Sequence, residues 1–151
     1  MDKKYILLIF IFVILLILGF FIYSSNTLNR SDVIQVGTTN FTMPEGYHIG
    51  EKNTFGAISI TNESNTIFLL ENNGTNVQGY IDIYRKILID KNESINITCF
   101  NIDNMEIYKI ISLNNTQNIH YYFIKNNKTY DVYTWDGNPK MDSTVIKLIE
   151  S

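Results

Sequence analysis

Hydrophobic and polar positions divide the 151-residue chain into two unlike parts. Residues 5–23 form an uncharged apolar run with a tyrosine at each end, whereas the rest alternates short apolar segments with polar turns. As a helix, a run of this length spans about 28 Å, close to the thickness of the hydrocarbon core of a bilayer. Residues 1–23 therefore predict a short cytoplasmic stub followed by a transmembrane anchor at Tyr5–Tyr23.

The charges beside this run predict its orientation. Lys3 and Lys4 precede it, whereas Arg30 on the far flank is offset by Asp32. The positive-inside rule then puts the N-terminus in the cytoplasm and the C-terminal domain outside the cell membrane. A cleaved signal peptide would have a shorter apolar run, with small residues three and one positions before the cut. The pattern therefore favours an uncleaved signal-anchor.

The segment after the anchor is polar at first. Residues 24–40 show no sustained period and predict a tether, so we expect the folded domain at residues 41–151. Pro44-Glu45-Gly46 predicts a turn with proline at its second position and glycine at its fourth. The apolar runs 57–60 and 66–70 predict a hairpin.

The remaining elements follow from hydrophobic spacing. Apolar residues three and four apart from Val77 to Leu88 predict an amphipathic helix that ends near Asp90. A second, short helix is expected at residues 144–150, capped by Ser143. Strands are expected at residues 95–100, 105–112, 119–125 and 129–135. Runs of consecutive strands pair antiparallel, so the prediction is an α+β domain: an antiparallel sheet packed with two helices, after an N-terminal transmembrane helix.

This order of elements resembles the PsbP/Mog1-like arrangement. The opening Phe-x-x-Pro-x-Gly motif is matched by Phe41, Pro44 and Gly46, and a terminal helix follows the aromatic hairpin. The usual aromatic of this motif is matched only by Tyr47. The resemblance implies binding or assembly and supplies no catalytic residue. With its lysine-flanked anchor and Asn-rich exterior, the whole chain also resembles small signal-anchored surface proteins of methanogenic archaea.

Asn-x-Ser/Thr sequons are more frequent than chance predicts. Eight occur, whereas random placement of the Asn, Ser and Thr residues would give about three. The candidate asparagines are Asn29, Asn40, Asn62, Asn73, Asn92, Asn96, Asn114 and Asn127. An AT-rich genome is an alternative cause of the asparagine content, but the excess of sequons favours a glycoprotein whose C-terminal domain is extracellular.

Charge and cysteine content exclude other classes. The net charge of −3 gives no basic field for nucleic acid. Cys99 is the only cysteine, so an internal disulfide is impossible. It shares a strand face with Ile95 and Ile97, which predicts a core position, whereas Asn96 lies on the opposite face. A nucleophile or an intermolecular bridge is the alternative for Cys99.

Candidates for catalysis or metal binding are sparse. His48 and His120 are about seventy positions apart and neither has metal-ligand spacing around it. The nearest carboxylate groupings are Asp103 with Glu106 and Asp131 with Asp136. Paired carboxylates must converge in space for acid–base work, which these spacings do not establish. We predict a protein without cofactor or metal that is not an enzyme.

Aromatic residues are concentrated in the predicted hairpin at 119–135. Period 2 places Tyr121 and Phe123 on one face of the sheet and Tyr122, Tyr133 and Trp135 on the other. The helices can cover one or both faces. If one face stays partly open, then Tyr122, Tyr133 and Trp135 are the binding candidates, as a platform for glycan rings or a partner protein.

Three functions fit these patterns. The first is a membrane-anchored, surface-exposed binding or assembly module, which an open aromatic strip would favour. The second is an accessory or sensory subunit of a membrane complex, whose anchor packs with another membrane protein. The third is a cell-surface carbohydrate-active hydrolase, which a cleft joining carboxylates with His48 or His120 would favour.

Overall fold

A computed structural model describes residues 13–18, 33–114, 118–136 and 141–151. The chain divides into two compact units, Met1–Ser31 and Asp32–Ser151. In the first unit, residues 13–18 are helical, and most of the predicted anchor lies outside the described residues. Of the helices in the described ranges, none has both the length and the apolar character needed to cross a bilayer.

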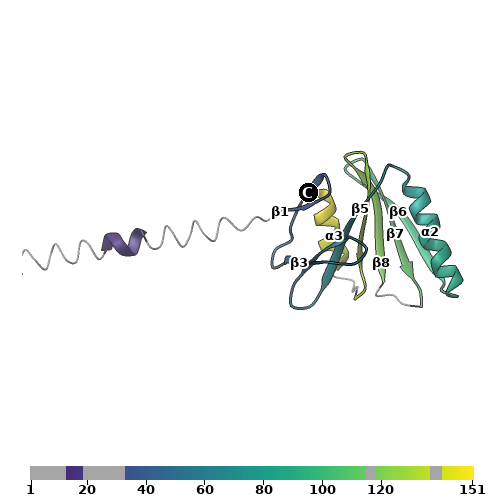
Figure 1. The fold of residues 1–151 in the computed structure, drawn as a ribbon, viewed down its shortest axis with the longest axis horizontal. Helices are drawn as coiled ribbons and strands as arrows, with labels where there is room; N and C mark the ends of the chain where they lie inside the picture. The colour runs from purple at the N-terminus through teal and green to yellow at the C-terminus, as the bar shows by residue number, and fades with distance from the viewer. Residues whose placement is uncertain (1–12, 19–32, 115–117, 137–140) are drawn as a thin grey trace, which may run out of the picture. The chain divides into compact units, whose positions relative to one another are not determined.

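The second unit is an α+β domain, as predicted (Figure 1). In its described part, seven antiparallel strands form one sheet in the order β3-β4-β5-β9-β8-β7-β6, and β1 and β2 form a separate pair. The helices α2 and α3 lie on opposite sides of the sheet. The elements are β1 (Val33–Val36), β2 (Thr39–Thr42), β3 (His48–Lys52), β4 (Ile58–Thr61), β5 (Thr66–Asn72), α2 (Val77–Asp90), β6 (Ile95–Ile102), β7 (Met105–Ser112), β8 (Ile119–Lys125), β9 (Lys128–Thr134) and α3 (Met141–Glu150).

The folded domain begins before Phe41. Strands β1 and β2 form a tight hairpin, whose side chains Ile34, Val36 and Phe41 are buried in the core. The prediction of a polar tether through residue 40 was therefore wrong for residues 33–40. The physical reason is the shortness of the two strands, because four residues on either side of a turn give no sustained period.

A carboxylate joins this hairpin to the sheet. Glu71 Oε2 accepts hydrogen bonds from the backbone N–H of Thr38 at 2.8 Å and from the Tyr130 hydroxyl at 2.7 Å. The hydrogen bond from Thr38 lowers the pKa of Glu71, and that from Tyr130 adds to the effect. The hairpin turn is thus tied to β5 and β9 through a single side chain.

The larger core lies between the sheet and α3. Tyr121, Phe123, Tyr130 and Val132 point to this side, as their alternation predicts. The residues of α3 that pack on them are Met141, Val145, Leu148 and Ile149.

Helix α3 begins at Met141, before the predicted start, so Ser143 lies inside the first turn rather than at the cap. Asp142 in this turn accepts hydrogen bonds from Lys109 and Tyr121. Its negative charge also interacts favourably with the positive, N-terminal end of the helix dipole. Polar contacts to β7 and β8 therefore fix the start of α3.

Helix α2 spans Val77–Asp90 and ends where the sequence predicts. The side chain of Asn76 accepts a hydrogen bond from the Gly79 N–H at 3.0 Å and caps the helix. Ile81 and Leu88 pack against Ile110 and Tyr122 in a smaller core. Helix α2 packs on β8, and the part of this face formed by β5 and β9 borders a hollow instead.

Two local predictions were wrong. The turn after β2 has Pro44 in first place and Gly46 in third, with Tyr47 N–H donating to Pro44 O at 3.1 Å. Gly46 has a φ of +80°, which the third position of a type II turn requires. Cys99 is exposed rather than in the core. Alternation shows which residues share a face but not whether that face is covered, and α2 packs on Ile95 alone in this strand.

Replacing Phe41 tests whether the hairpin belongs to the folded domain. Its ring is fully buried and meets the rings of Tyr130 and Phe123 edge-on, at centroid distances of 5.3 and 6.4 Å. We expect Phe41→Ala to lower the free energy of unfolding by about 3–5 kcal/mol, measured by chemical denaturation. Val33→Ala in the same hairpin is the control, since Val33 is exposed; an equal, small effect of both would contradict this assignment.

Candidate functional site

A hollow of about 580 Å³ lies between α2 and the half of the sheet formed by β5 and β9. We call it the aromatic groove. Helix α2 lines one side with Tyr80, Ile83, Tyr84 and Ile87. The sheet lines the other with Leu70, His120, Tyr122, Asp131 and Tyr133, and Phe55 and Trp135 stand at the rim. The volume is that of an ordinary ligand site.

Three rings stand side by side on this face of the sheet. Phe68, Tyr133 and His120 are direct partners across β5, β9 and β8. The ring centroids are 5.0 Å apart for Phe68 and Tyr133 and 4.8 Å for Tyr133 and His120, with nearly parallel planes. Trp135 packs on Phe68 at 4.8 Å. Strand register, which is fixed by backbone pairing, therefore holds these rings in place.

A buried histidine–carboxylate pair lies in the floor. His120 Nδ1 is 2.9 and 3.0 Å from the two carboxylate oxygens of Asp131, and both side chains are buried. The ring of Tyr84 covers His120 with centroids 4.1 Å apart. A carboxylate at Nδ1 keeps a proton on that nitrogen, so Nε2 is the acceptor when the ring is neutral.

The tyrosines beside this pair are held in their neutral form. Burial raises the pKa of Tyr122, and the charge of Asp131 and a hydrogen bond to it raise it further. Burial also raises the pKa of Tyr84, followed by the charges of Asp131 and Glu93. The floor thus presents phenol hydroxyls, not phenolates, at neutral pH.

Hydrogen bonds of the Asn53 side chain hold the loop that carries Phe55. Asn53 Oδ1 accepts hydrogen bonds from the backbone N–H groups of Phe55 and Ala57, each at 3.0 Å. Asn53 Nδ2 donates to the Tyr133 hydroxyl at 2.8 Å. Gly56 supplies the positive φ of +88° that the loop needs. The backbone of Phe55 is therefore held at the rim of the aromatic groove, and 76% of the residue's surface is exposed.

Most polar groups of the lining bond to the protein itself. Besides the pairs already described, Tyr80 donates to Asn73 O at 3.0 Å and Asn118 Nδ2 donates to the Tyr84 hydroxyl at 2.9 Å. Asn118 Oδ1 is closed off from solvent and has no hydrogen-bond partner within the described part of the chain. Contacts available to a ligand in the aromatic groove are accordingly mostly apolar.

The structure brings the three aromatic candidates together. Tyr122, Tyr133 and Trp135 all line the aromatic groove, with the first two in its floor and Trp135 half exposed at its rim. Sequence reasoning missed the pairing of His120 with Asp131 and the role of Phe55. The available signal was Asn53-Thr54-Phe55-Gly56, a tight-turn sequence with an aromatic at its tip.

The other candidate residues lie apart. His48 is exposed in β3. Glu106 accepts hydrogen bonds from Tyr108 at 2.7 Å and from Cys99 at 3.4 Å. Asp136 accepts from Thr134 at 2.6 Å, while its predicted companion Asp131 pairs with His120. Neither carboxylate pair suggested by the sequence forms a joint site in these contacts.

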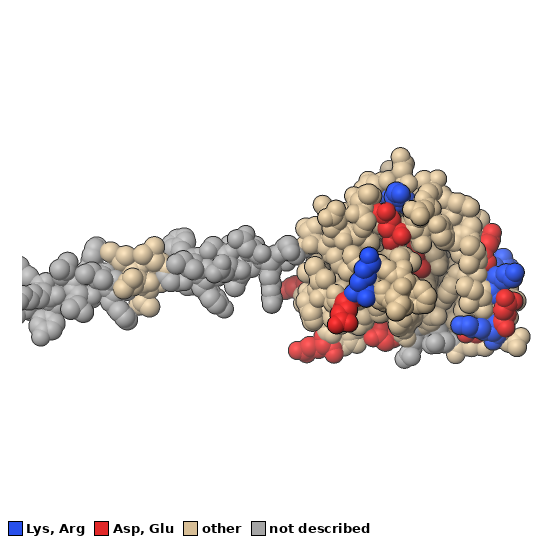
Figure 2. Space-filling view, viewed as in Figure 1, with Lys and Arg blue, Asp and Glu red and all other residues tan. Residues whose placement is uncertain are grey.

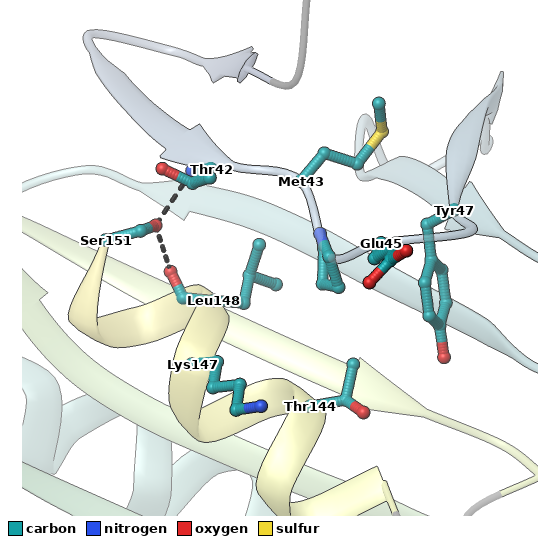
Figure 3. A pocket seen from close by; sticks show the side chains of 9 residues that line it. Thr42, Met43, Glu45, Tyr47, Thr144, Lys147, Leu148 and Ser151 are labelled. Carbon is teal, nitrogen blue, oxygen red and sulfur yellow. Dashed lines mark hydrogen bonds between the residues drawn. The ribbon is translucent and has the colours of Figure 1, made fainter.

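A smaller hollow of about 400 Å³ lies between α3 and the segment that joins β2 to β3 (Figure 3). Ser151 closes one end: its hydroxyl accepts from Thr42 N–H at 2.8 Å and donates to Leu148 O at 2.7 Å. Lys147 and Glu45 also line it. Its polar contacts serve to dock the end of α3, so the aromatic groove is the stronger candidate.

On the face of the domain seen in Figure 2, acidic and basic side chains mix over the end of α2, and further acidic and basic groups are scattered over the middle and the lower left. Among the residues that the structure describes, no three His, Cys, Asp or Glu side chains cluster as metal ligands do. The chain matches no protein-family model, and no curated protein is significantly similar to it.

The raised pKa values predict how stability depends on pH. Because the folded-state pKa values of Tyr84 and Tyr122 lie above the ordinary value, keeping these phenols neutral stabilises the fold fully below about pH 10. That contribution is lost as the pH rises from there through the folded-state pKa. We expect these tyrosines to ionise only as the domain unfolds in alkali, measured by phenolate absorbance. The denatured chain is the control, and native tyrosines that all titrate together near pH 10 would contradict this.

Proposed function

We propose that the chain is a membrane-anchored, surface-exposed binding module whose aromatic groove holds apolar side chains of a partner protein. The observation that carries this proposal is the apolar rim. Phe55, Ile83, Ile87 and Trp135 are between 45% and 76% exposed around one hollow. Contiguous exposed apolar surface marks interaction sites in soluble domains.

Preorganisation supports the same proposal. The backbone at Phe55 is held by a hydrogen bond to Asn53, and the ring of Trp135 packs on Phe68. Side chains that are already ordered lose little entropy on binding, and aromatic residues in such positions dominate interface energetics.

A protein segment fits the lining better than a glycan does. Sugar hydroxyls need free hydrogen-bonding groups, whereas the floor hydroxyls and amides here bond mainly to one another. The aliphatic rim residues Ile83 and Ile87 suit apolar side chains instead. From Tyr80 to Lys91, the groove follows α2 for about 17 Å, enough for a short segment of a partner.

The proposal also includes how the module is attached to the membrane and on which side it lies. We place the anchor at Tyr5–Tyr23 and the domain outside the cell, where it can act alone or as an accessory subunit of a membrane complex. Accessible sequons support this topology: of those in the described residues, six asparagines are exposed and Asn62 is half-buried. The sheet with a helix on each face supports a PsbP/Mog1-like arrangement.

Photo-crosslinking in intact cells tests the proposal. A photoreactive residue at position 83, in the groove, is compared with one at position 89, which lies on the same helix outside it. Both isoleucines are about equally exposed, at 61% and 52%. We expect one partner to be captured from position 83 and not from position 89.

Rim substitutions then separate specific from chance capture. Phe55→Ala and Trp135→Ala should each reduce capture about tenfold, the typical effect of removing an aromatic anchor, while the domain stays folded by circular dichroism. Equal capture from both helix positions, or capture that survives the double substitution, would refute the proposal.

A hydrolase is the second candidate, because His120 and Asp131 meet in a groove. An imidazole oriented by a carboxylate can act as a general base through Nε2. If this holds, the purified full chain turns over members of a panel of glycosides and esters, and Asp131→Asn abolishes turnover without unfolding the domain. An absence of turnover throughout the panel argues for the binding module.

A further inference from the structure

The two edges of the seven-stranded sheet differ in their protection. Strand β3 is short, carries Glu51 and Lys52, and has a register shift against β4 between Ile49 and Lys52. Strand β6 pairs with β7 over eight consecutive residues without a shift. Its sequence Ile95–Ile102 contains neither a charged residue nor a proline. Charges, bulges and shortness are the usual devices that stop sheet edges from associating, and β6 has none of them.

An unprotected edge strand can pair with another chain because its outward backbone groups have no partner. In an antiparallel pair, alternate residues direct their N–H and C=O groups away from the partner strand, so half of those in β6 point outward. The described residues contribute no strand beyond β6. A second copy of the chain could therefore pair with this edge.

Asn96 stands on this strand. Of the sequon asparagines that the structure describes, it alone lies within a strand of the seven-stranded sheet, and it is exposed. We propose that an N-linked glycan on Asn96 covers the β6 edge and prevents edge-to-edge pairing of two copies. The glycan thereby protects the β6 edge from pairing, as the charged residues and the register shift protect the β3 edge.

The modification itself is an ordinary glycosyl transfer. The side-chain nitrogen of Asn96 forms a bond with the anomeric carbon of a lipid-linked oligosaccharide. The bond between that carbon and the phosphate oxygen of the donor breaks, and the lipid phosphate leaves with its electron pair. One amide proton passes to a base. Thr98 supplies the third residue of the sequon and shares the face of Asn96 in β6.

The sole cysteine reports on the pairing. Two copies of β6 can pair antiparallel about a two-fold axis that sets Cys99 directly opposite its counterpart. Paired strands bring opposite Cα atoms to about 4.5–5.5 Å, within the range that a disulfide spans. Cys99 is exposed, so mild oxidation can trap such a dimer.

The test uses the full chain made in cells that carry out N-glycosylation. Asn96→Gln and Thr98→Val both destroy the sequon, and Thr98→Ser keeps it. Asn127→Gln removes a sequon from the exposed turn between β8 and β9 and controls for loss of any one glycan. Glycopeptide mass spectrometry measures occupancy, and light scattering with non-reducing electrophoresis measures dimers.

We expect the parent, Thr98→Ser and Asn127→Gln proteins to carry a glycan at Asn96 and to stay monomeric. Asn96→Gln and Thr98→Val should both form dimers that oxidation links through Cys99, at least tenfold above the parent. An unmodified Asn96 in the parent would overturn the proposal. So would variants that lose the glycan and remain monomeric, or dimers that Asn127→Gln forms equally well.

Discussion

The pairing of β5 with β9 is the contact on which the rest of the domain depends. It joins the strands β3–β5 to the meander β6–β9, and its partners, such as Phe68 and Tyr133, are far apart in the chain. Closing such a loop costs entropy before any contact is gained. The same register sets Phe68, Tyr133 and His120 in one row. A slip of one residue would turn Tyr133 to the other face and remove the floor of the aromatic groove.

Sequence patterns predicted the elements that have long, regular periods. The ends of α2 and the faces of β8 and β9 follow from spacing alone, because a helix or strand of seven or more residues repeats its period several times. The hairpin β1–β2 is too short for that. Whether a face is covered depends on partners distant in sequence, which is why Cys99 was misplaced and the His120–Asp131 pair was missed. The membrane anchor and the resemblance to the PsbP/Mog1-like arrangement stay predictions.

The aromatic groove has a geometric origin. Seven strands at a spacing of about 4.8 Å make a sheet roughly 30 Å wide, whereas a helix with its side chains is about 10–12 Å across. On one face, α3 is supplemented by the hairpin β1–β2; on the other, α2 is the one element of the described chain that packs on the sheet, against β7 and β8. One helix cannot cover that face, so Leu70, Tyr133 and Trp135 border a hollow. Within that hollow, His120 and Asp131 bond to each other, which satisfies both polar groups in a buried setting.

The unequal edges of the sheet limit how far copies of the chain can assemble. A fibre grows only if each added unit offers a fresh competent edge at its far side. Here the far side is always β3, with its register shift and its charged residues Glu51 and Lys52. Two copies joined through β6 consequently make a closed, two-fold symmetric pair with β3 at both outer ends. Because the β6 and β3 edges differ, association through β6 stops at a dimer and does not continue into a fibre.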